Sequence, residues 1–292
     1  MKSDDCQYFI GVDGGGTRCR VRLRKADGSE LAYCEGGSAN VHTDPEGALA
    51  TIRSTVDRAI QSAGAVSVDP SKTAIGLGLA GIVSLADSGR VQASLAGYAH
   101  VMAASDAAAA CIGAHYGADG GLVIAGTGSA GLAYLNGKMT AIGGRGFAIS
   151  DEGSAARIGW EALRQSLWAA DDLGPPSKMT RQIMARFDND PAAITRWSAN
   201  ARSSDYGALA PIVFGNAEKG DAVALPIIKQ ATRDILNLHA ALHRLGCARV
   251  SLVGGLSEPL KPWIELIAPY PFVEPLHDAA DGAILMAGGK LQ

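Results

Sequence analysis

The chain has 292 residues, enough for about two domains of ordinary size, and its 47% hydrophobic and 19% charged residues are typical of a folded globular protein. The net charge of −3 gives no bulk attraction to nucleic acid or to anionic membranes, and no apolar run reaches the ~18 residues that span a bilayer. Five scattered cysteines without a CxxC pair, and an acidic N-terminus without a signal-peptide pattern, predict a cytoplasmic protein with reduced thiols.

The N-terminal segment predicts three short strands followed by a helix. An apolar strand is expected over 8–12, and a second over 19–24, where arginines alternate with apolar residues and predict one covered and one wet face. An Asp-Gly hairpin signal separates it from a third strand at 30–35. An apolar period of 3.6 then predicts an amphipathic helix over 46–63.

Strands and helices continue to alternate after this helix. Strands are expected at 73–80 and 100–104, a short helix at 91–96, and a helix at 107–115. Most of the second half is predicted to be helical, with helices at 154–169, 178–187, 190–201, 221–245 and 278–287 and a strand at 249–253.

The pattern of the N-terminal segment starts again at residue 122. A strand at 122–125 runs into Gly126–Ser129, and strands at 131–135 and 138–142 follow, separated by an Asn-Gly turn. Laid on Gly14–Thr17, this second turn aligns both halves as strand, Gly-rich turn, strand, Asx-Gly turn, strand. The sequence therefore predicts an α/β protein built by internal duplication.

The Gly-rich turns match neither nucleotide-binding plan that uses a helix N-terminus. The string GxxxxGK[ST] is absent, and a strand period follows Gly14–Thr17, whereas a dinucleotide-binding turn opens a helix. A hairpin turn whose backbone N–H groups face an anion remains, and glycine suits it through positive φ and close backbone approach. Asp13, at the end of the first strand, is placed either to hold hydrated Mg²⁺ or to start an Asx turn.

Five motifs in order carry a resemblance to a known family. They are Ile10-Gly-Val-Asp-Gly-Gly-Gly-Thr17, Ser105-Asp-Ala-Ala108, Ile124-Ala-Gly-Thr-Gly-Ser129, Gly143-Gly-Arg-Gly-Phe-Ala-Ile-Ser-Asp-Glu-Gly-Ser-Ala155 and Val253-Gly-Gly255. Together they resemble the superfamily of sugar kinases, actin and heat-shock chaperone ATPases, and more closely its BadF/BadG and N-acetylglucosamine kinase branch.

The resemblance implies two RNase H-like, actin-like ATPase domains around a central cleft. The N-terminal domain would cover 1–107, and the C-terminal domain, with helical insertions, 108–277. The last helix, about 278–292, would pack back on the first domain. A homodimer is also implied.

The resemblance further implies ATP and Mg²⁺ as cofactors. Asp13 would hold Mg²⁺ through water. The turns of both halves would contact the β- and γ-phosphates, through Gly14, Gly15, Gly16 and Thr17, and through Gly126, Thr127, Gly128 and Ser129. Gly254 and Gly255 would lie against the adenosine.

Asp106 matches the position of the catalytic base in this family. It follows a predicted strand and opens a predicted helix, and one carboxylate that accepts the substrate hydroxyl proton suffices for phosphoryl transfer. The alternative from the residues alone is that Asp106 is only the N-cap of that helix, a position that favours aspartate.

The residues implied for the sugar are Ser38, Asn40, Asp106, Thr127, Gly144, Arg145, Asp151 and Glu152. Amides and carboxylates can bind vicinal hydroxyls, although the two adjacent acids could also form an ordinary acidic first turn of a helix. Arg145 stands where animal-type N-acetylglucosamine kinases carry tryptophan, whereas bacterial glucosamine kinases share Gly-Gly-Arg. Because a cation repels an ammonium group, Arg145 is expected to organise neighbouring acids rather than to touch the 2-amino group.

The sequence thus predicts an ATP- and Mg²⁺-dependent kinase that phosphorylates the 6-hydroxyl of glucosamine. A kinase for N-acetylglucosamine or another hexose remains open. An ATPase activator of the BadF kind would need cysteines around an iron–sulfur cluster, and a sugar sensor would not need Asp106.

No nucleic-acid partner is expected, so the strand arginines are predicted to lie on an outer sheet face. His239 and His243, four residues apart, fit a helix face better than a metal site because no third ligand is evident.

Overall fold

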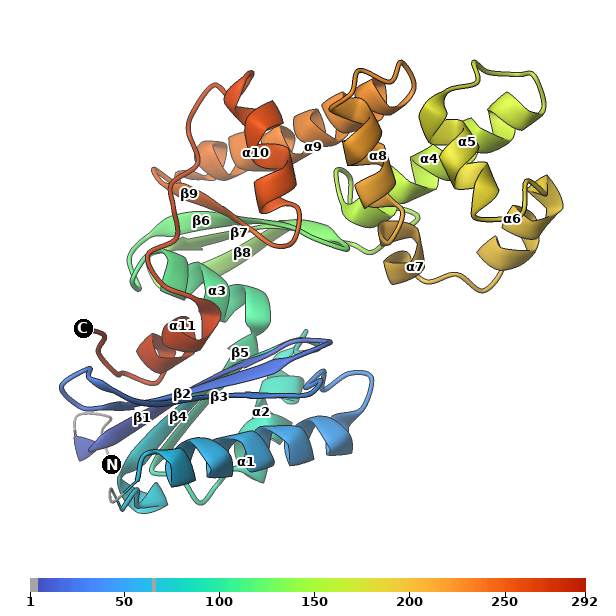
Figure 1. Cartoon of the computed structure of the whole chain (residues 1–292). Helices are drawn as coiled ribbons and strands as arrows, with labels where there is room; N and C mark the ends of the chain where they lie inside the picture. The colour runs from blue at the N-terminus through green and yellow to red at the C-terminus, as the bar shows by residue number, and fades with distance from the viewer. Residues whose placement is uncertain (1–4, 65–66) are drawn as a thin grey trace. The chain divides into compact units, whose positions relative to one another are not determined.

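The structure, a computed structural model, describes residues 5–64 and 67–292; the first four residues of the acidic N-terminus lie outside this description. The chain divides into two compact units (Figure 1). The first comprises Met1–Gly120, Tyr134–Met139 and Glu274–Gln292, and the second Gly121–Ala133 and Thr140–Val273. None of the described helices is long and apolar enough to cross a membrane.

The first unit is built on a five-stranded sheet with the order β3-β2-β1-β4-β5. Its first three strands are antiparallel neighbours, whereas β4 and β5 run parallel to β1. The strands are β1 (Tyr8–Gly14), β2 (Cys19–Lys25), β3 (Glu30–Gly36), β4 (Thr73–Leu79) and β5 (His100–Ser105).

Helices cover both faces of this sheet (Figure 1). They are α1 (Pro45–Ser62), a 3₁₀ helix (Pro70–Lys72), α2 (Leu85–Ser94), α3 (Asp106–Ala114) and α11 (Ala279–Met286). The apolar side of α1 packs on β2 and β3, while α11 and α3 pack together and cover β1 and β4 from the other side. This arrangement buries β1 and β4 on both faces, which explains their continuous apolar runs.

Glycines allow α11 to approach the sheet closely. A Cβ added at Gly76 would stand 1.8 Å from the carbonyl oxygen of Ala283, and one added at Gly11 would stand 2.0 Å from that of Ala280. The contact of α11 with α3 is equally close, because a Cβ at Gly282 would lie 1.9 Å from the oxygen of Ala109. Glycine is therefore required at these positions by packing rather than by turn geometry.

The arginine face of β2 does not lie on the outside, so the predicted wet face is wrong for most of its length. Arg24 is only 8% exposed, and its Nε donates to Asp281 Oδ1 at 3.0 Å. Nη1 of Arg22 lies 2.8 Å from both Asp278 and Asp281, at the start of α11. These arginines hold a helix that arrives some 250 residues later in the chain.

Glu30 and His277 complete this buried ion network. Arg22 Nε lies 3.0 Å from Glu30 Oε2 without the alignment of a hydrogen bond, so charge attraction joins them. His277 Nδ1 lies 3.2 Å from Asp281 Oδ2. Two guanidinium groups thus surround one buried carboxylate, the arrangement in which a buried charge is tolerated.

The second unit carries a four-stranded sheet with the order β8-β7-β6-β9, in which β9 runs parallel to β6. This order repeats that of β3-β2-β1-β4 and confirms the predicted duplication. The strands are β6 (Gly120–Ala125), β7 (Ser129–Leu135), β8 (Lys138–Gly143) and β9 (Val250–Val253). The helices are α4 (Ala155–Ala170), α5 (Lys178–Ala185), α6 (Pro191–Ser198), α7 (Ser203–Gly207), α8 (Ala210–Ala217), α9 (Ala224–Leu245) and α10 (Ser257–Glu265).

Several helices differ from the prediction. The short helix expected at 91–96 is α2, which begins at Leu85 because Ser84 and Asp87 form a capping box. The helix expected at 190–201 ends at Ser198, and α10, which contains Pro262, was not predicted.

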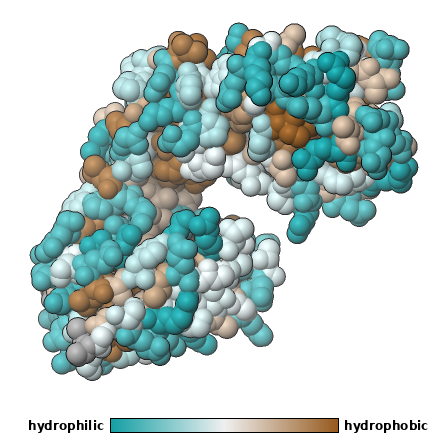
Figure 2. All heavy atoms as spheres, viewed as in Figure 1, coloured by the Kyte–Doolittle hydropathy of each residue, from teal (hydrophilic) through white to brown (hydrophobic). Residues whose placement is uncertain are grey.

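Figure 2 shows hydrophilic residues predominating on the visible surface of each unit, with single apolar residues between them.

Candidate active site

The first Gly-rich turn lies at the C-terminal end of β1, and neighbouring segments hold it through backbone hydrogen bonds. Gly15 N–H donates to Arg18 O at 2.8 Å, which closes the turn. Ala80 N–H donates to Gly14 O at 2.7 Å, and Ala39 N–H to Gly15 O at 3.0 Å. The turn is thereby tied to the ends of β3 and β4.

The open side of this turn presents backbone donors. Among the described residues, the N–H groups of Gly16 and Thr17 have no protein acceptor. Free N–H groups in such a turn can serve as an anion-binding nest. The expectation of positive φ is wrong, however, because neither Gly15 nor Gly16 has a left-handed backbone. Glycine matters at Gly14, where a Cβ would stand 2.5 Å from the side chain of Leu79.

Asp13 precedes the turn and is paired with an arginine across the hairpin. Its Oδ2 accepts from Nη1 of Arg20 at 3.0 Å, and its side chain is 17% exposed. Burial raises the pKa of Asp13, the bond to Arg20 lowers it, and the charges of Asp106 and Asp278 raise it again. Asp13 makes no Asx turn among the described hydrogen bonds, so the alternative role has no support.

Asp106 is the first residue of α3, directly after β5. The N-cap is Ser105, whose Oγ accepts from Ala108 N–H at 3.2 Å, so Asp106 is not the cap. Oδ1 of Asp106 accepts from Ala107 N–H at 2.8 Å, and burial raises the pKa of the carboxyl group. The carboxylate is thus oriented from its own helix. Gly78 lies in the neighbouring strand β4, and as a glycine it lets this strand come close to the backbone of Asp106.

Ser38 and Asn40 line a cavity of about 270 Å³ between the end of β3 and the start of α1. The side-chain oxygen of Asn40 accepts from His42 N–H at 2.9 Å and from Thr43 N–H at 3.2 Å. Its amide nitrogen donates to no acceptor among the described residues. Gly81 lies beside it with φ of 94°, and a Cβ there would come within 2.7 Å of the Asn40 oxygen.

The second Gly-rich turn is held in the same manner in the other unit. Its carbonyl groups accept from the first turn of α4, with Ala155 N–H to Gly126 O at 2.9 Å and Ala156 N–H to Thr127 O at 3.2 Å. Within the described part of the chain, the N–H groups of Thr127 and Gly128 donate to no protein acceptor. This turn therefore offers a second nest.

The predicted adenosine glycines lie next to this turn. Gly254 has φ of 105°, and a Cβ on it would stand 2.4 Å from the oxygen of Ala125. Leu256 N–H donates to the same oxygen at 2.9 Å. Gly255 has no atom within 4 Å of an added Cβ, so it borders open space.

Asp151 is the buried acid of the predicted sugar loop, which is the motif Gly143–Ala155. Its Oδ1 accepts from Gly146 N–H at 3.2 Å, and its Oδ2 would meet a Cβ on Gly128 at 2.6 Å. Asp151 has φ of 64°, a strained backbone for a residue other than glycine, and burial raises the pKa of its carboxyl group. Because α4 begins at Ala155 with Ser154 as N-cap, Asp151 does not belong to an ordinary acidic first turn.

The other predicted sugar residues of this loop, Gly144, Arg145 and Glu152, are exposed. Glu152 is anchored through its backbone oxygen, which accepts from Ser129 Oγ at 2.7 Å. Gly144 has φ of 63° and packs against Ala130. Arg145 forms no ion pair with the described residues, so its expected role in organising acids has no support.

Two residues of α9 were not predicted from the sequence. Asp234 and Asn237 line a cavity of about 270 Å³ together with Gly144, Glu152 and Ser129. Burial raises the pKa of Asp234, as does the charge of Glu152. Both residues lie on the polar face of an amphipathic helix, where the sequence pattern indicates only solvent.

The predicted site residues fall into two groups. Asp13, the first turn, Ser38, Asn40 and Asp106 belong to the first unit, whereas the second turn, the sugar loop, Gly254 and Gly255 belong to the second.

The remaining candidates for metal binding do not form a cluster. The described residues contain no group of three histidine, cysteine, aspartate or glutamate side chains placed to hold a metal ion. His239 and His243 approach to 3.2 Å between their Nε2 atoms, and His239 is fully buried against Phe272.

Solved structures with this fold define the class of protein. A ROK family glucokinase from Streptomyces griseus, solved with glucose and AMPPNP, shares the fold with a TM-score of 0.54 at 18% identity, over 97% of this chain and 98% of that one. A candidate N-acetylglucosamine kinase from Chromobacterium violaceum has a TM-score of 0.85 at 33% identity, over 97% of this chain and 99% of its own. The chain thus has the two-domain α/β fold of the sugar kinases and actin-like ATPases.

Within this class, the sequence profile of the BadF/BadG/BcrA/BcrD ATPase family matches residues 10–287, and the chain belongs to that family. Glucosamine kinase GspK of Vibrio cholerae is 35% identical over 281 residues, which are 96% of each chain. The N-acetyl-D-glucosamine kinase of Dictyostelium discoideum is 26% identical over an aligned length of 313 residues, and the alignment covers 96% of this chain and 98% of that protein.

Proposed function

We propose that the protein is a hexosamine kinase that transfers the γ-phosphoryl group of ATP to the 6-hydroxyl of glucosamine. The broader class, a sugar kinase, follows from the curated relatives, which are named as glucosamine, N-acetylglucosamine and N-acetylmuramic acid/N-acetylglucosamine kinases. Glucosamine is preferred because the relative with 35% identity acts on it by name. Arg145 supports this choice, since it replaces the tryptophan of the animal-type enzymes.

The observation that carries the proposal is the grouping of Asp13, the first turn and Asp106 in one unit. The charge of Asp106 acts on Asp13, and the free N–H groups of Gly16 and Thr17 follow Asp13 directly. A base, a metal carboxylate and a phosphate nest are the parts that phosphoryl transfer needs.

The carboxylate of Asp13 is suited to be a ligand of Mg²⁺. Mg²⁺ prefers one or two carboxylates together with water and substrate phosphates, and Asp13 offers a half-buried carboxylate beside the nest. The metal would neutralise charge on the phosphates. The two turns would contact the β- and γ-phosphates through Gly14–Thr17 and Gly126–Ser129. Gly254 and Gly255 would border the adenosine.

Asp106 would accept the proton of the 6-hydroxyl as phosphoryl transfer proceeds. Its raised pKa brings the carboxyl group nearer to the operating pH, which favours general-base catalysis. Its backbone hydrogen bond to Ala107 keeps the carboxylate oriented while one oxygen takes the proton. Positioning therefore supplies much of the rate enhancement.

The sugar hydroxyls would be bound by Asp151, Asn40, Ser38, Thr127, Gly144 and Glu152. Asp151 is the strongest acceptor among them because it is buried and already held by Gly146. The left-handed backbone of Asp151 is the kind of strain that is kept at functional sites.

We also propose that the protein is cytoplasmic and forms a homodimer. Sedimentation analysis tests the homodimer.

An ADP-release assay with glucosamine, N-acetylglucosamine, glucose and no sugar tests the function. Turnover with glucosamine should exceed that with the other sugars, and turnover without sugar should be low. If turnover is highest with N-acetylglucosamine, the proposed substrate is wrong but the class, a sugar kinase, stands.

Asp106→Asn tests the base. We expect kcat to fall about 10²- to 10⁴-fold, with ADP binding retained, because the proton acceptor is lost and the shape is kept. Asp57→Asn, at an exposed position of α1, is the matched control and should keep full activity. Full activity of Asp106→Asn would refute the assignment.

An ATPase activator with an iron–sulfur cluster is the alternative function within the same family. Cys19 lies in β2, Cys111 in α3 and Cys247 between α9 and β9, and the sequence has no CxxC pair that would support this alternative. Iron analysis of anaerobically purified protein tests it, and stoichiometric iron would favour the activator.

A further inference from the structure

Arg20 lies directly opposite Asp13 in the β1–β2 hairpin. The register pairs the two residues, and Nη1 of Arg20 donates to Oδ2 of Asp13 at 3.0 Å. Among the described residues, Arg20 is the only cation in an ion pair with Asp13. The carboxylate proposed to hold Mg²⁺ thus already has a positive partner.

The neighbouring arginines on the same face cannot take over this position. Arg22 is held by Asp278 and Asp281, and Arg24 by Asp281, Glu30 and the oxygen of Gly28. Their side chains are 15% and 10% exposed, whereas that of Arg20 is 40% exposed. Arg20 is therefore the arginine of β2 that has room to move.

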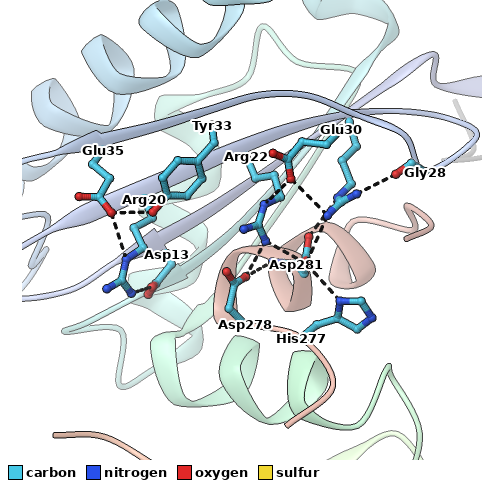
Figure 3. A network of polar contacts seen from close by, with 11 residues as sticks. Asp13, Arg20, Arg22, Gly28, Glu30, Tyr33, Glu35, His277, Asp278 and Asp281 are labelled. Atoms are coloured by element: carbon cyan, nitrogen blue, oxygen red, sulfur yellow. Dashed lines mark hydrogen bonds and ion pairs between the residues drawn. The ribbon is translucent and has the colours of Figure 1, made fainter. Parts of the chain in front are cut away.

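A second partner for Arg20 stands within reach. Its Nε lies 3.7 Å from Oε1 of Glu35, which pairs with Arg20 on the adjacent strand β3. The hydroxyl of Tyr33 donates to the same oxygen at 2.6 Å and fixes the carboxylate (Figure 3). The guanidinium group thus lies between two carboxylates, one at the proposed metal position and one away from it.

We propose that Arg20 is an exchangeable counter-cation of Asp13, which pairs with Asp13 when no metal is bound and moves to Glu35 when Mg²⁺ takes its place. The proposal rests on the proposed role of Asp13 as the Mg²⁺ carboxylate. Two cations beside one carboxylate repel each other, so Mg²⁺ and Arg20 compete for the place next to Asp13. The exchange keeps the buried carboxylate neutralised before the metal arrives.

Two substitutions with opposite expected effects test the exchange. Arg20→Gln removes the competitor, and should lower the Mg²⁺ concentration for half-maximal ADP binding about two- to fivefold, the range of a partly exposed ion pair. Glu35→Gln removes the second partner of Arg20, and should raise that concentration by a similar factor. Isothermal titration calorimetry follows ADP binding at fixed ADP and varied Mg²⁺. It measures this Mg²⁺ concentration for both variants without turnover.

Lys25→Gln is the matched control, because it removes the same charge from an exposed position at the end of the same strand. It should leave the Mg²⁺ requirement unchanged, which separates exchange from a general charge effect. If either shift of the two test variants is absent or reversed, the exchange is refuted. A loss of ADP affinity in EDTA for Arg20→Gln would also refute it, since Arg20 would then be a phosphate ligand.

Asp13→Asn distinguishes failure of this inference from failure of the proposed function. If Asp13→Asn abolishes the Mg²⁺ dependence while Arg20→Gln leaves it unchanged, only the exchange falls. If Asp13→Asn itself leaves the Mg²⁺ dependence unchanged, the metal role of Asp13 falls, and the exchange falls with it.

Discussion

Replacing Arg24 with glutamine removes one cation from the buried ion network that joins β2 to α11. Four contacts are lost: Nε to Oδ1 of Asp281 at 3.0 Å, Nη2 to Oδ2 of Asp281 at 3.4 Å, Nη1 to the oxygen of Gly28 at 2.8 Å, and Nη2 to Glu30 at 3.4 Å. The side chains of Arg24 and Asp281 are 10% and 6% exposed, so solvent cannot replace these contacts.

The expected cost is about 3 kcal/mol of unfolding free energy. Breaking a buried ion pair by removing one partner costs about 3–5 kcal/mol, because a charge is left uncompensated. Here Asp281 keeps Arg22 at 2.8 Å and His277 at 3.2 Å, which places the cost at the lower end. Glu30 is half exposed and adds little.

Urea unfolding followed by circular dichroism measures this change, with Arg90→Gln as the matched control. Arg90 pairs with Asp87 on the surface of α2 and is 76% exposed, so its loss should cost less than about 1 kcal/mol. Hydrogen exchange of Ala279–Met286 should also accelerate in Arg24→Gln, because α11 loses its anchor. Equal, small costs for the two variants would refute the view that the network holds the C-terminal helix.

Two further substitutions test packing and pH dependence. Gly76→Ala should destabilise the protein by about 3 kcal/mol or more, because its Cβ would stand 1.8 Å from a carbonyl oxygen of α11. Gly89→Ala should instead stabilise the protein by up to about 1 kcal/mol, because Gly89 lies in an exposed helix and no atom lies within 4 Å of an added Cβ. Urea unfolding measures both variants, and free-energy changes of the same sign would contradict the close packing at Gly76. Burial, and then the charge of His243, lowers the pKa of His239 from 6.5 to about 4. Because the unfolded state binds this proton first, stability falls as pH drops below 6.5, by about 2 kcal/mol near pH 5, and His239→Gln should lose this part of the pH dependence.

The duplicated hairpins could be predicted because their signals are local. A Gly-rich turn between two strands and an Asx-Gly turn after the second one recur in both halves, and both sheets show the same strand order. The shift in α2 arose because its cap, Ser84 with Asp87, lies ahead of the apolar residues that marked the helix. The apolar period locates the buried face of a helix, whereas capping residues determine where it begins.

The position of α11 could not be predicted from β2, because its contacts join residues far apart in the chain. Alternating arginines indicate a strand, but they do not reveal whether water or a second set of charges covers them. Asp278 and Asp281 serve as N-cap and first-turn acid of α11 as well as partners of Arg22 and Arg24. Local helix capping alone accounts for acids at these two positions, so the sequence gives no sign of their second role.

The candidate site shows the same division. Asp13 and Asp106 stand at strand ends next to glycine or a helix start, where motif order alone marks them as candidates. Arg20 and Asp234 lie on the surface of a strand and a helix, where charged residues usually meet solvent. Only the register of the β1–β2 pair places Arg20 against Asp13. Because a hairpin register follows from its turn, this partner was accessible in principle: Gly14 opposite Cys19 puts Asp13 opposite Arg20.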